Sequence, residues 1–281
     1  MDTTAATTSA AHPDDTTDAG IAWVDGTIVD AAEATVPLVD DGFLRGDAVF
    51  ESVLVRRGAT HALDEHLARM RRSARAIDLP LPELGEVVDD LLAAWGRRDG
   101  SMKLIVTRGG TVRGILFPVT EWPASVSLAT VEVPWRSALS GVKTLSYAAN
   151  QWAKREAAAR GADDALIVDD GVVHELATGT IVAVHDGVLT SPDAATTPIL
   201  DSVTLEVLRR DVEIAAGRLD LEALLAADEL FVVSATRPVI AVHELILTDG
   251  DRRHLDGPGP VTARARAALQ GRIDAEVDAR H

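Results

Sequence analysis

The strongest constraint on the fold is the placement of Asp-Gly dipeptides between short apolar runs. They occur at Asp25-Gly26, Asp170-Gly171 and Asp186-Gly187. Asp-Gly favours the two-residue turn of a β-hairpin, because both residues tolerate positive φ angles. Segments of helical periodicity alternate with these hairpins, for example residues 65–77, which end before Pro80. This alternation predicts a mixed α/β (α+β) fold.

Composition and pattern divide the chain into four regions. Residues 1–20 contain mainly Thr, Ala and Asp, and since they offer little apolar surface to bury, we expect a disordered tail. Residues 21–135 alternate strand and helix patterns and predict a small N-terminal α/β domain. The stretch 136–140 is expected to link it to a larger C-terminal domain at residues 141–281.

The composition excludes several classes of protein. Lys+Arg 27 against Asp+Glu 44 gives a net charge of −17, which disfavours nucleic acid and anionic membranes as partners. The chain has no Cys, so disulfides, thiolate ligands and a Cys nucleophile are excluded, and we expect no metal site. No apolar run approaches the roughly 20 residues of a transmembrane helix, and residues 1–20 lack the basic and apolar parts of a signal peptide. We therefore expect a cytoplasmic protein.

Lysine is rare in this chain, with only Lys103, Lys143 and Lys154 among 27 basic residues. Lys154 lies beside other charged residues on a predicted helix, which favours a solvated face. Lys103 alternates with apolar residues in a predicted strand, which favours the polar side of a sheet. Lys143 has no acidic residue within seven positions on either side, and a lysine held away from water without a counter-ion is a workable nucleophile and base. The alternative for Lys143 is a strand-end lysine that reaches water.

Short motifs occur along residues 22–275 in one order. They are residues 45–51, 65–70, 106–109, 143–147, 153–157, 161–166, 174–175, 186–189, 191–192, 200–204 and 228–232. Together they resemble the class IV aminotransferase family, the fold-type-IV pyridoxal phosphate (PLP) enzymes. The resemblance implies two α/β domains with PLP in the cleft between them, and a homodimer.

The resemblance implies a role for each matching residue. Lys143 matches the lysine that forms the Schiff base with PLP and moves a proton at the substrate Cα. Glu175 matches the carboxylate that pairs with the pyridine nitrogen, which keeps the ring an electron sink. Arg69 matches the phosphate-binding arginine, and Val203 and Thr204 match the groups that cradle the phosphate at a helix start.

Three further residues match cofactor contacts. Leu200 matches the residue that packs on the PLP ring. Tyr147, the one Tyr of the chain, lies where some members place a tyrosine against the PLP 3′-oxygen, with a core aromatic as the alternative. Thr178 keeps a hydroxyl in the run 175–180, which departs from the common Glu-Gly-Ser-Ser-Ser-Asn. This departure predicts weaker PLP binding, and a relative that has lost catalysis is a further alternative.

The substrate residues separate the family members less clearly. Arg113 matches the arginine that binds the substrate α-carboxylate in D-amino acid members, but Ile115 replaces their histidine. Phe50 stands where they place a tyrosine. We therefore favour 4-amino-4-deoxychorismate lyase, which forms p-aminobenzoate and pyruvate, over a transaminase for branched-chain or D-amino acids. Either reaction takes a small-molecule amino substrate.

Overall fold

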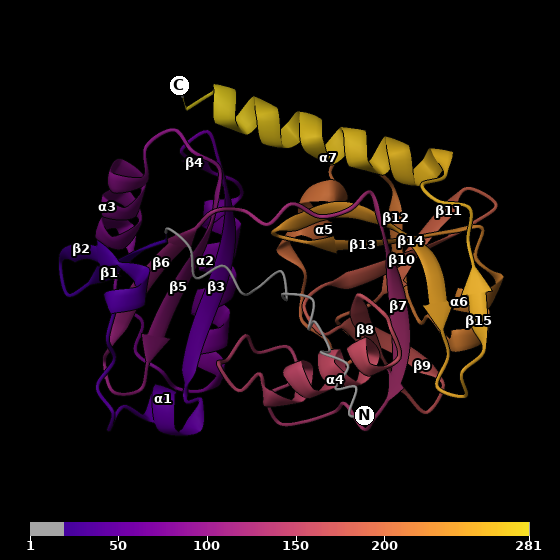
Figure 1. Cartoon of the computed structure of the whole chain (residues 1–281), viewed down its shortest axis with the longest axis horizontal. Coiled ribbons are helices and arrows are strands. Elements are labelled where there is room, and N and C mark those ends of the chain that lie inside the picture. The colour runs from indigo at the N-terminus through magenta and orange to yellow at the C-terminus, as the bar shows by residue number, and fades with distance from the viewer. Residues whose placement is uncertain (1–19, 281) are drawn as a thin grey trace, which may run out of the picture.

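The computed structural model describes residues 20–280 and contains two β-sheets with helices around them (Figure 1). This arrangement confirms the predicted mixed α/β fold. The predicted tail at 1–20 lies outside the described residues, apart from Gly20. Gly20 is buried, and its carbonyl accepts a hydrogen bond from Ala31 N at 3.0 Å, which ties this residue to the segment after the first hairpin.

The first sheet has six strands in the order β2-β1-β6-β5-β3-β4, and all its neighbouring strands are antiparallel. The strands are β1 Ile21–Val24, β2 Thr27–Asp30, β3 Ala48–Arg56, β4 Ala59–Thr60, β5 Gly100–Thr107 and β6 Val112–Phe117. The accompanying helices are η1 Ala31–Glu33, α1 Asp41–Arg45, α2 Leu63–Ala76 and α3 Gly85–Trp95. Asp25 and Gly26 both have positive φ and form the predicted turn between β1 and β2.

Alternating side chains give this sheet two different faces. One face packs against α2 and α3 in an apolar core that includes Val53, Met70 and Leu104. Side chains at the intervening positions point to the opposite face, and there they line a cavity. These residues are Phe50, Ser52, Ser101 and Lys103.

The second sheet has nine strands in the order β12-β11-β10-β13-β14-β7-β8-β9, with β15 paired to β14. The strands are β7 Ser125–Glu132, β8 Asp164–Asp169, β9 Val172–Leu176, β10 Thr180–His185, β11 Val188–Pro192, β12 Ile214–Gly217, β13 Glu229–Ser234, β14 Arg237–Ile246 and β15 Arg252–His254. The helices are α4 Ala148–Ala159, α5 Val203–Leu208, α6 Leu221–Ala226 and α7 Pro260–Asp278. Asp170-Gly171 and Asp186-Gly187 form the predicted turns between β8 and β9 and between β10 and β11.

The division between the sheets differs from the predicted domain boundary at residue 135. Strand β7 precedes that residue, yet it lies in the second sheet, parallel to both β14 and β8. Six of its eight residues are buried, as expected for a strand covered on both faces. Local periodicity does not reveal this pairing, because β14 begins only at Arg237. The sheets therefore divide between Phe117 and Ser125.

The segment that carries Lys143 joins β7 to α4 and docks on the first sheet. Phe50 N donates to Lys143 O at 3.1 Å, and Lys143 N donates to Ser73 Oγ at 3.1 Å. An isolated antiparallel bridge between Val49 and Thr144 adds to this docking. The backbone of Lys143 is thus held by the small domain, although its neighbours in sequence lead into the larger one.

Helix α7 contacts both domains, and Figure 1 shows it crossing beside both sheets with its C-terminal end near β4. Leu269 and Ile273 are fully buried in a core shared with α5 and strands of the second sheet. Near the helix end, Glu276 Oε2 lies 2.6 Å from His61 Nδ1 and accepts from Ala62 N at 3.1 Å. Within residues 20–280, no helix is both long and apolar enough to cross a membrane.

The burial of α7 makes Leu269→Ala a test of this packing. We expect the substitution to lower the free energy of unfolding by about 2–5 kcal/mol, because it leaves a cavity in a closed core. Urea denaturation followed by circular dichroism measures the change. Arg264→Ala on the exposed side of the same helix should change it by no more than about 0.5 kcal/mol. Equal effects of the two variants would contradict the described packing.

Candidate active site

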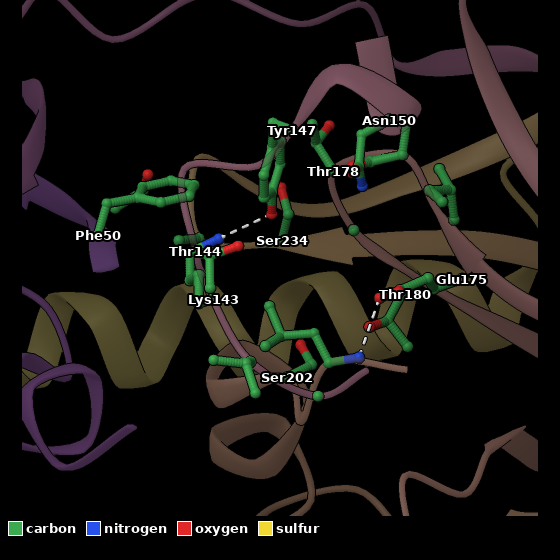
Figure 2. A pocket seen from close by; sticks show the side chains of 18 of the residues that line it. Phe50, Lys143, Thr144, Tyr147, Asn150, Glu175, Thr178, Thr180, Ser202 and Ser234 are labelled. Atoms are coloured by element: carbon green, nitrogen blue, oxygen red, sulfur yellow. Dashed lines mark hydrogen bonds between the residues drawn. The ribbon is translucent and has the colours of Figure 1, made fainter. Parts of the chain in front are cut away.

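A cavity of about 430 Å³ is lined by residues of both domains, within the range of roughly 300–1,000 Å³ that is typical of small-molecule sites. The small domain contributes Phe50 and Arg69, the larger domain contributes Glu175 and Thr204, and the connecting segment contributes Lys143. Figure 2 shows Phe50, Lys143 and Glu175 among the side chains around this space. Residues far apart in the sequence therefore meet in one site.

Lys143 is buried, and its amine contacts aromatic groups. Its Nζ lies 3.2 Å from the hydroxyl oxygen of Tyr147, to which it donates a hydrogen bond (Figure 2), and 4.2 Å from the centroid of the Phe50 ring. The Phe50 and Tyr147 rings meet edge to face, with centroids 5.1 Å apart. Tyr147 therefore lies beside Lys143 with its hydroxyl bound to the amine, and its predicted contact with the PLP 3′-oxygen stays a prediction. Aromatic walls around an amine exclude water from it while leaving its tip open to the cavity.

Glu175 lies at the end of β9, deep in the protein, and the part of it that is accessible faces the cavity. Its Oε1 accepts from Trp135 Nε1 at 2.9 Å, and its Oε2 accepts from Leu200 N at 3.1 Å (Figure 2). Burial raises the pKa of the Glu175 carboxyl, and these hydrogen bonds and the charge of Lys143 oppose only part of that rise. Its negative charge is therefore poorly compensated by the protein, which suits a carboxylate that pairs with a cationic ligand group.

Arg69 is held by a buried carboxylate on β3. Its Nε donates to Glu51 Oε1 at 2.7 Å and its NH2 donates to Glu51 Oε2 at 2.8 Å. His66 Nδ1 lies 2.9 Å from the same Oε2. Burial alone raises the pKa of Glu51, but Arg69 and His66 more than offset this and lower the pKa to about 2. Sequence analysis did not single out Glu51 or His66, although both fall within motifs of the family resemblance.

The start of α5 lies next to Arg69. Ser202 precedes the helix, and Val203 and Thr204 are its first residues, buried and lining the cavity. Arg69 NH1 donates to the carbonyl oxygen of Asp201 at 2.8 Å. The structure therefore brings together the three residues predicted to bind a phosphate, Arg69, Val203 and Thr204.

Sequence analysis missed Arg237, which is 2% exposed and lines the cavity. Its NH1 donates to Asp164 Oδ2 at 2.6 Å, and its NH2 donates to Thr178 Oγ1 at 2.9 Å. The guanidinium carbon lies 4.7 Å from the Trp122 ring centroid. Thr178 lines the cavity, and its hydroxyl accepts the hydrogen bond from Arg237. A lone Arg before a Pro gives no local signal of this network.

The predicted substrate residues are separated by the structure. Phe50 lines the cavity beside Lys143, but Arg113 is not among the lining residues. Arg113 NH1 lies 2.9 Å from Asp25 Oδ1, and its Nε donates to Thr35 O at 2.9 Å. These partners belong to the first hairpin and the loop that follows it, so within one chain Arg113 is held away from Lys143.

All three lysines of the chain line the cavity. Lys154 was predicted to lie on a solvated face, but it is 6% exposed, because this side of α4 faces the cavity. Six cationic side chains line the cavity in all, and Glu175 is the one carboxylate among the described lining residues. The cations are Arg69, Lys103, Arg136, Lys143, Lys154 and Arg237. A cavity lined mainly by cationic side chains, in a chain of net charge −17, favours an anionic ligand.

No group of three or more His, Asp or Glu that could hold a metal ion is found among residues 20–280.

Comparison with known families agrees with this geometry. The family model of class IV aminotransferases matches residues 48–245, a range that includes strands of both sheets and every cavity residue named above. The chain belongs to the class IV aminotransferase family, whose members are PLP-dependent enzymes.

Relatives of similar length extend the match over nearly the whole chain. A D-alanine aminotransferase of Bacillus licheniformis is 30% identical over 89% of this chain and 96% of its own length. A bifunctional aminodeoxychorismate lyase / D-amino acid transaminase of Mycobacterium tuberculosis is 31% identical over 83% of this chain and 92% of its own. The PLP-bound structure of a hypothetical aminotransferase from M. tuberculosis has a TM-score of 0.80 at 27% identity, over 91% of this chain and 99% of its own.

The raised pKa of Glu175 predicts a pH dependence of stability in the PLP-free protein. A carboxyl whose pKa is higher in the folded state keeps its proton when the unfolded chain has already lost it. Its contribution to stability is therefore lost as the pH rises from about 4.5, its usual pKa, towards the raised value. We expect Glu175→Gln to remove this loss, so the variant gains stability relative to the parent as the pH rises.

Urea denaturation at a series of pH values measures this difference. Glu156→Gln, which removes an exposed carboxyl from α4, is the matched control and should run parallel to the parent. A Glu175→Gln curve parallel to the parent would show that the carboxyl has no shifted pKa.

Proposed function

We propose that this chain binds PLP through Lys143 and transfers an amino group between a small amino acid and a keto acid. The observation that carries the proposal is that one cavity is lined by both the shielded amine of Lys143 and the buried carboxyl of Glu175. The family membership of the chain and the aminotransferase relatives support the same chemistry.

The residues present fit PLP. Lys143 offers an amine to the cofactor aldehyde, and Glu175, whose raised pKa reflects an uncompensated carboxylate, offers a counter-charge to a protonated pyridine nitrogen. Arg69, Val203 and Thr204 lie where one anionic group could contact them together. Leu200 donates its backbone N–H to Glu175. It therefore lies beside the place where the pyridine ring of PLP would pair with that carboxyl. When bound, PLP supplies an electron sink for the bonds at the substrate Cα.

The side chains of the cavity perform the remaining tasks. The Lys143 amine takes the proton from the substrate Cα and returns a proton to the adjacent cofactor carbon. This task requires a mobile base within reach of both atoms. Tyr147 holds that amine through its hydroxyl and keeps it oriented between transfers. The other cations of the cavity, with Lys103 on the wall formed by β5, attract the substrate carboxylate. Phe50 covers the amine and excludes water.

A second candidate is 4-amino-4-deoxychorismate lyase. It is favoured by the M. tuberculosis relative, which is described as both a lyase and a D-amino acid transaminase. The lyase substrate is a carboxylated ring, which also suits a cation-lined cavity. Pyruvate released from aminodeoxychorismate alone supports the lyase, whereas a keto acid formed from D-alanine or a branched-chain amino acid with 2-oxoglutarate supports the transaminase.

Lys143→Ala tests the proposal. The purified parent incubated with PLP should develop a visible absorbance band that borohydride fixes covalently, and peptide mapping should find the label on Lys143. The variant should lose the band and at least roughly 100- to 10,000-fold of the turnover rate, the usual contribution of a general base. Lys103→Ala is the matched control and should keep the band. Labelling of Lys103 or Lys154 instead would refute the assignment.

We also propose that the chain forms a homodimer through the apolar segment 36–44. Val36, Leu38, Val39, Phe43 and Leu44 are all exposed, and Leu38 and Val39 reach 73% and 83%. Five large apolar side chains within nine residues form a patch that a second copy of the chain would cover.

Size-exclusion chromatography with light scattering tests this association. The parent should elute with twice the 29.7 kDa mass of the chain, and Phe43→Asp should shift it towards the monomer, because a buried charge is costly. Val188→Asp, at an exposed apolar position on β11, should leave the mass unchanged. A monomeric parent would refute the proposal.

A further inference from the structure

We propose that Glu51 is a positioning residue for the cofactor phosphate, which sets the guanidinium of Arg69 so that this chain selects phosphorylated pyridoxal. The inference rests on the role of Arg69 proposed above. It adds a residue outside the cofactor contacts, and it assigns to that residue the discrimination between PLP and its unphosphorylated form.

Glu51 places a carboxylate within an apolar layer, where a charged side chain is unexpected on grounds of stability. Its carboxyl is fully buried and belongs to the side of β3 that packs on α2, in the layer that holds Val49, Val53 and Met70. A buried ion pair costs several kcal/mol to desolvate, and an apolar replacement of similar volume is often neutral or stabilising. Stability alone therefore does not explain a carboxylate at this position.

The hydrogen bonds of Glu51 fix the plane of the Arg69 guanidinium. Two parallel bonds, from Arg69 Nε and NH2 to the two carboxylate oxygens, are 2.7 and 2.8 Å long, and such a fork allows one orientation only. His66 Nδ1, 2.9 Å from Oε2 and one helical turn before Arg69, holds the carboxylate from a second side. Both carboxylate oxygens are thus engaged, and rotation of the group would break these bonds.

This orientation directs the third nitrogen of Arg69 towards the larger domain. NH1 donates to Asp201 O at 2.8 Å, and Asp201 belongs to the larger domain. The three bonds use three of the five guanidinium N–H groups. Arg69 lines the cavity together with Ser202, Val203 and Thr204, so the two remaining N–H groups are available to a phosphate bound beside residues 202–204. Because Arg69 and His66 lower the pKa of Glu51 to about 2, the carboxylate is charged at neutral pH.

The two explanations of Glu51 make opposite predictions. If the carboxylate only neutralises Arg69, its removal strengthens the attraction between Arg69 and phosphate. If it positions Arg69, a shorter side chain of the same charge weakens phosphate binding. Glu51→Asp separates them, because it keeps the charge and withdraws the carboxylate by one methylene.

The experiment measures dissociation constants for PLP and for pyridoxal by absorbance titration, together with competition by inorganic phosphate. The parent should bind PLP more tightly than pyridoxal. Glu51→Asp should lower the ratio of the two affinities by roughly 10- to 100-fold, the scale seen when a residue that orients a ligand-binding side chain is changed, and leave the affinity for pyridoxal unchanged. Glu51→Gln should have the same effect. Inorganic phosphate should compete with PLP in the parent and less in both variants.

Two controls distinguish this inference from the proposed function. Arg75→Gln removes an exposed cation from α2 and should leave the ratio unchanged, whereas Arg69→Lys should lower it. If Arg69→Lys leaves the ratio unchanged, the phosphate site itself is wrong. If Arg69→Lys lowers it and Glu51→Asp does not, the site stands and the role of Glu51 is refuted. A parallel loss of PLP and pyridoxal affinity, or tighter PLP binding in Glu51→Gln, also refutes it.

Discussion

The active site depends on the way the Lys143 segment is fixed to the small domain. The backbone of Lys143 makes two hydrogen bonds to this domain: its carbonyl accepts from Phe50 N on β3, and its N–H donates to the Ser73 side chain on α2. The larger domain supplies Glu175 from β9 and Thr204 from α5. Lys143 is hydrogen-bonded to the small domain, whereas Glu175 lies in the larger domain. The distance between the two side chains is therefore set by how the two domains pack together.

Charge separates the inside of the site from the rest of the molecule. The chain has a net charge of −17, whereas the cavity is lined by six cations and one carboxyl. An anionic substrate is repelled by the overall charge and attracted only where these cations face the solvent. The low lysine content sharpens this contrast, since all three lysines are used in the cavity and the acidic surface is balanced almost entirely by arginine.

Sequence motifs indicated residues that line the cavity, whereas the pairing of strands within the sheets could not be inferred from local patterns. Lys143, Glu175 and Arg69 could be found because their motifs follow the family order, and the structure places all three around one cavity. The membership of β7 in the second sheet depends on a pairing with β14, which local periodicity does not encode. Lys154 was misjudged because charged neighbours in sequence point to other faces of the helix. Arg237 was missed because its partners, Asp164 and Thr178, lie far from it in sequence.

The two faces of the small-domain sheet have a consequence for how this enzyme could change its substrate. Along β3 and β5, residues that hold the core alternate with residues that face the cavity. Ser52, Ser101 and Lys103 line the cavity and are not members of the apolar core cluster formed with α2 and α3. Variation at these positions can therefore reshape one wall of the cavity while the scaffold behind it stays intact. Alternate residues of the same strands thus determine substrate specificity and the stability of the fold. Substitutions can change the first set of residues without changing the second.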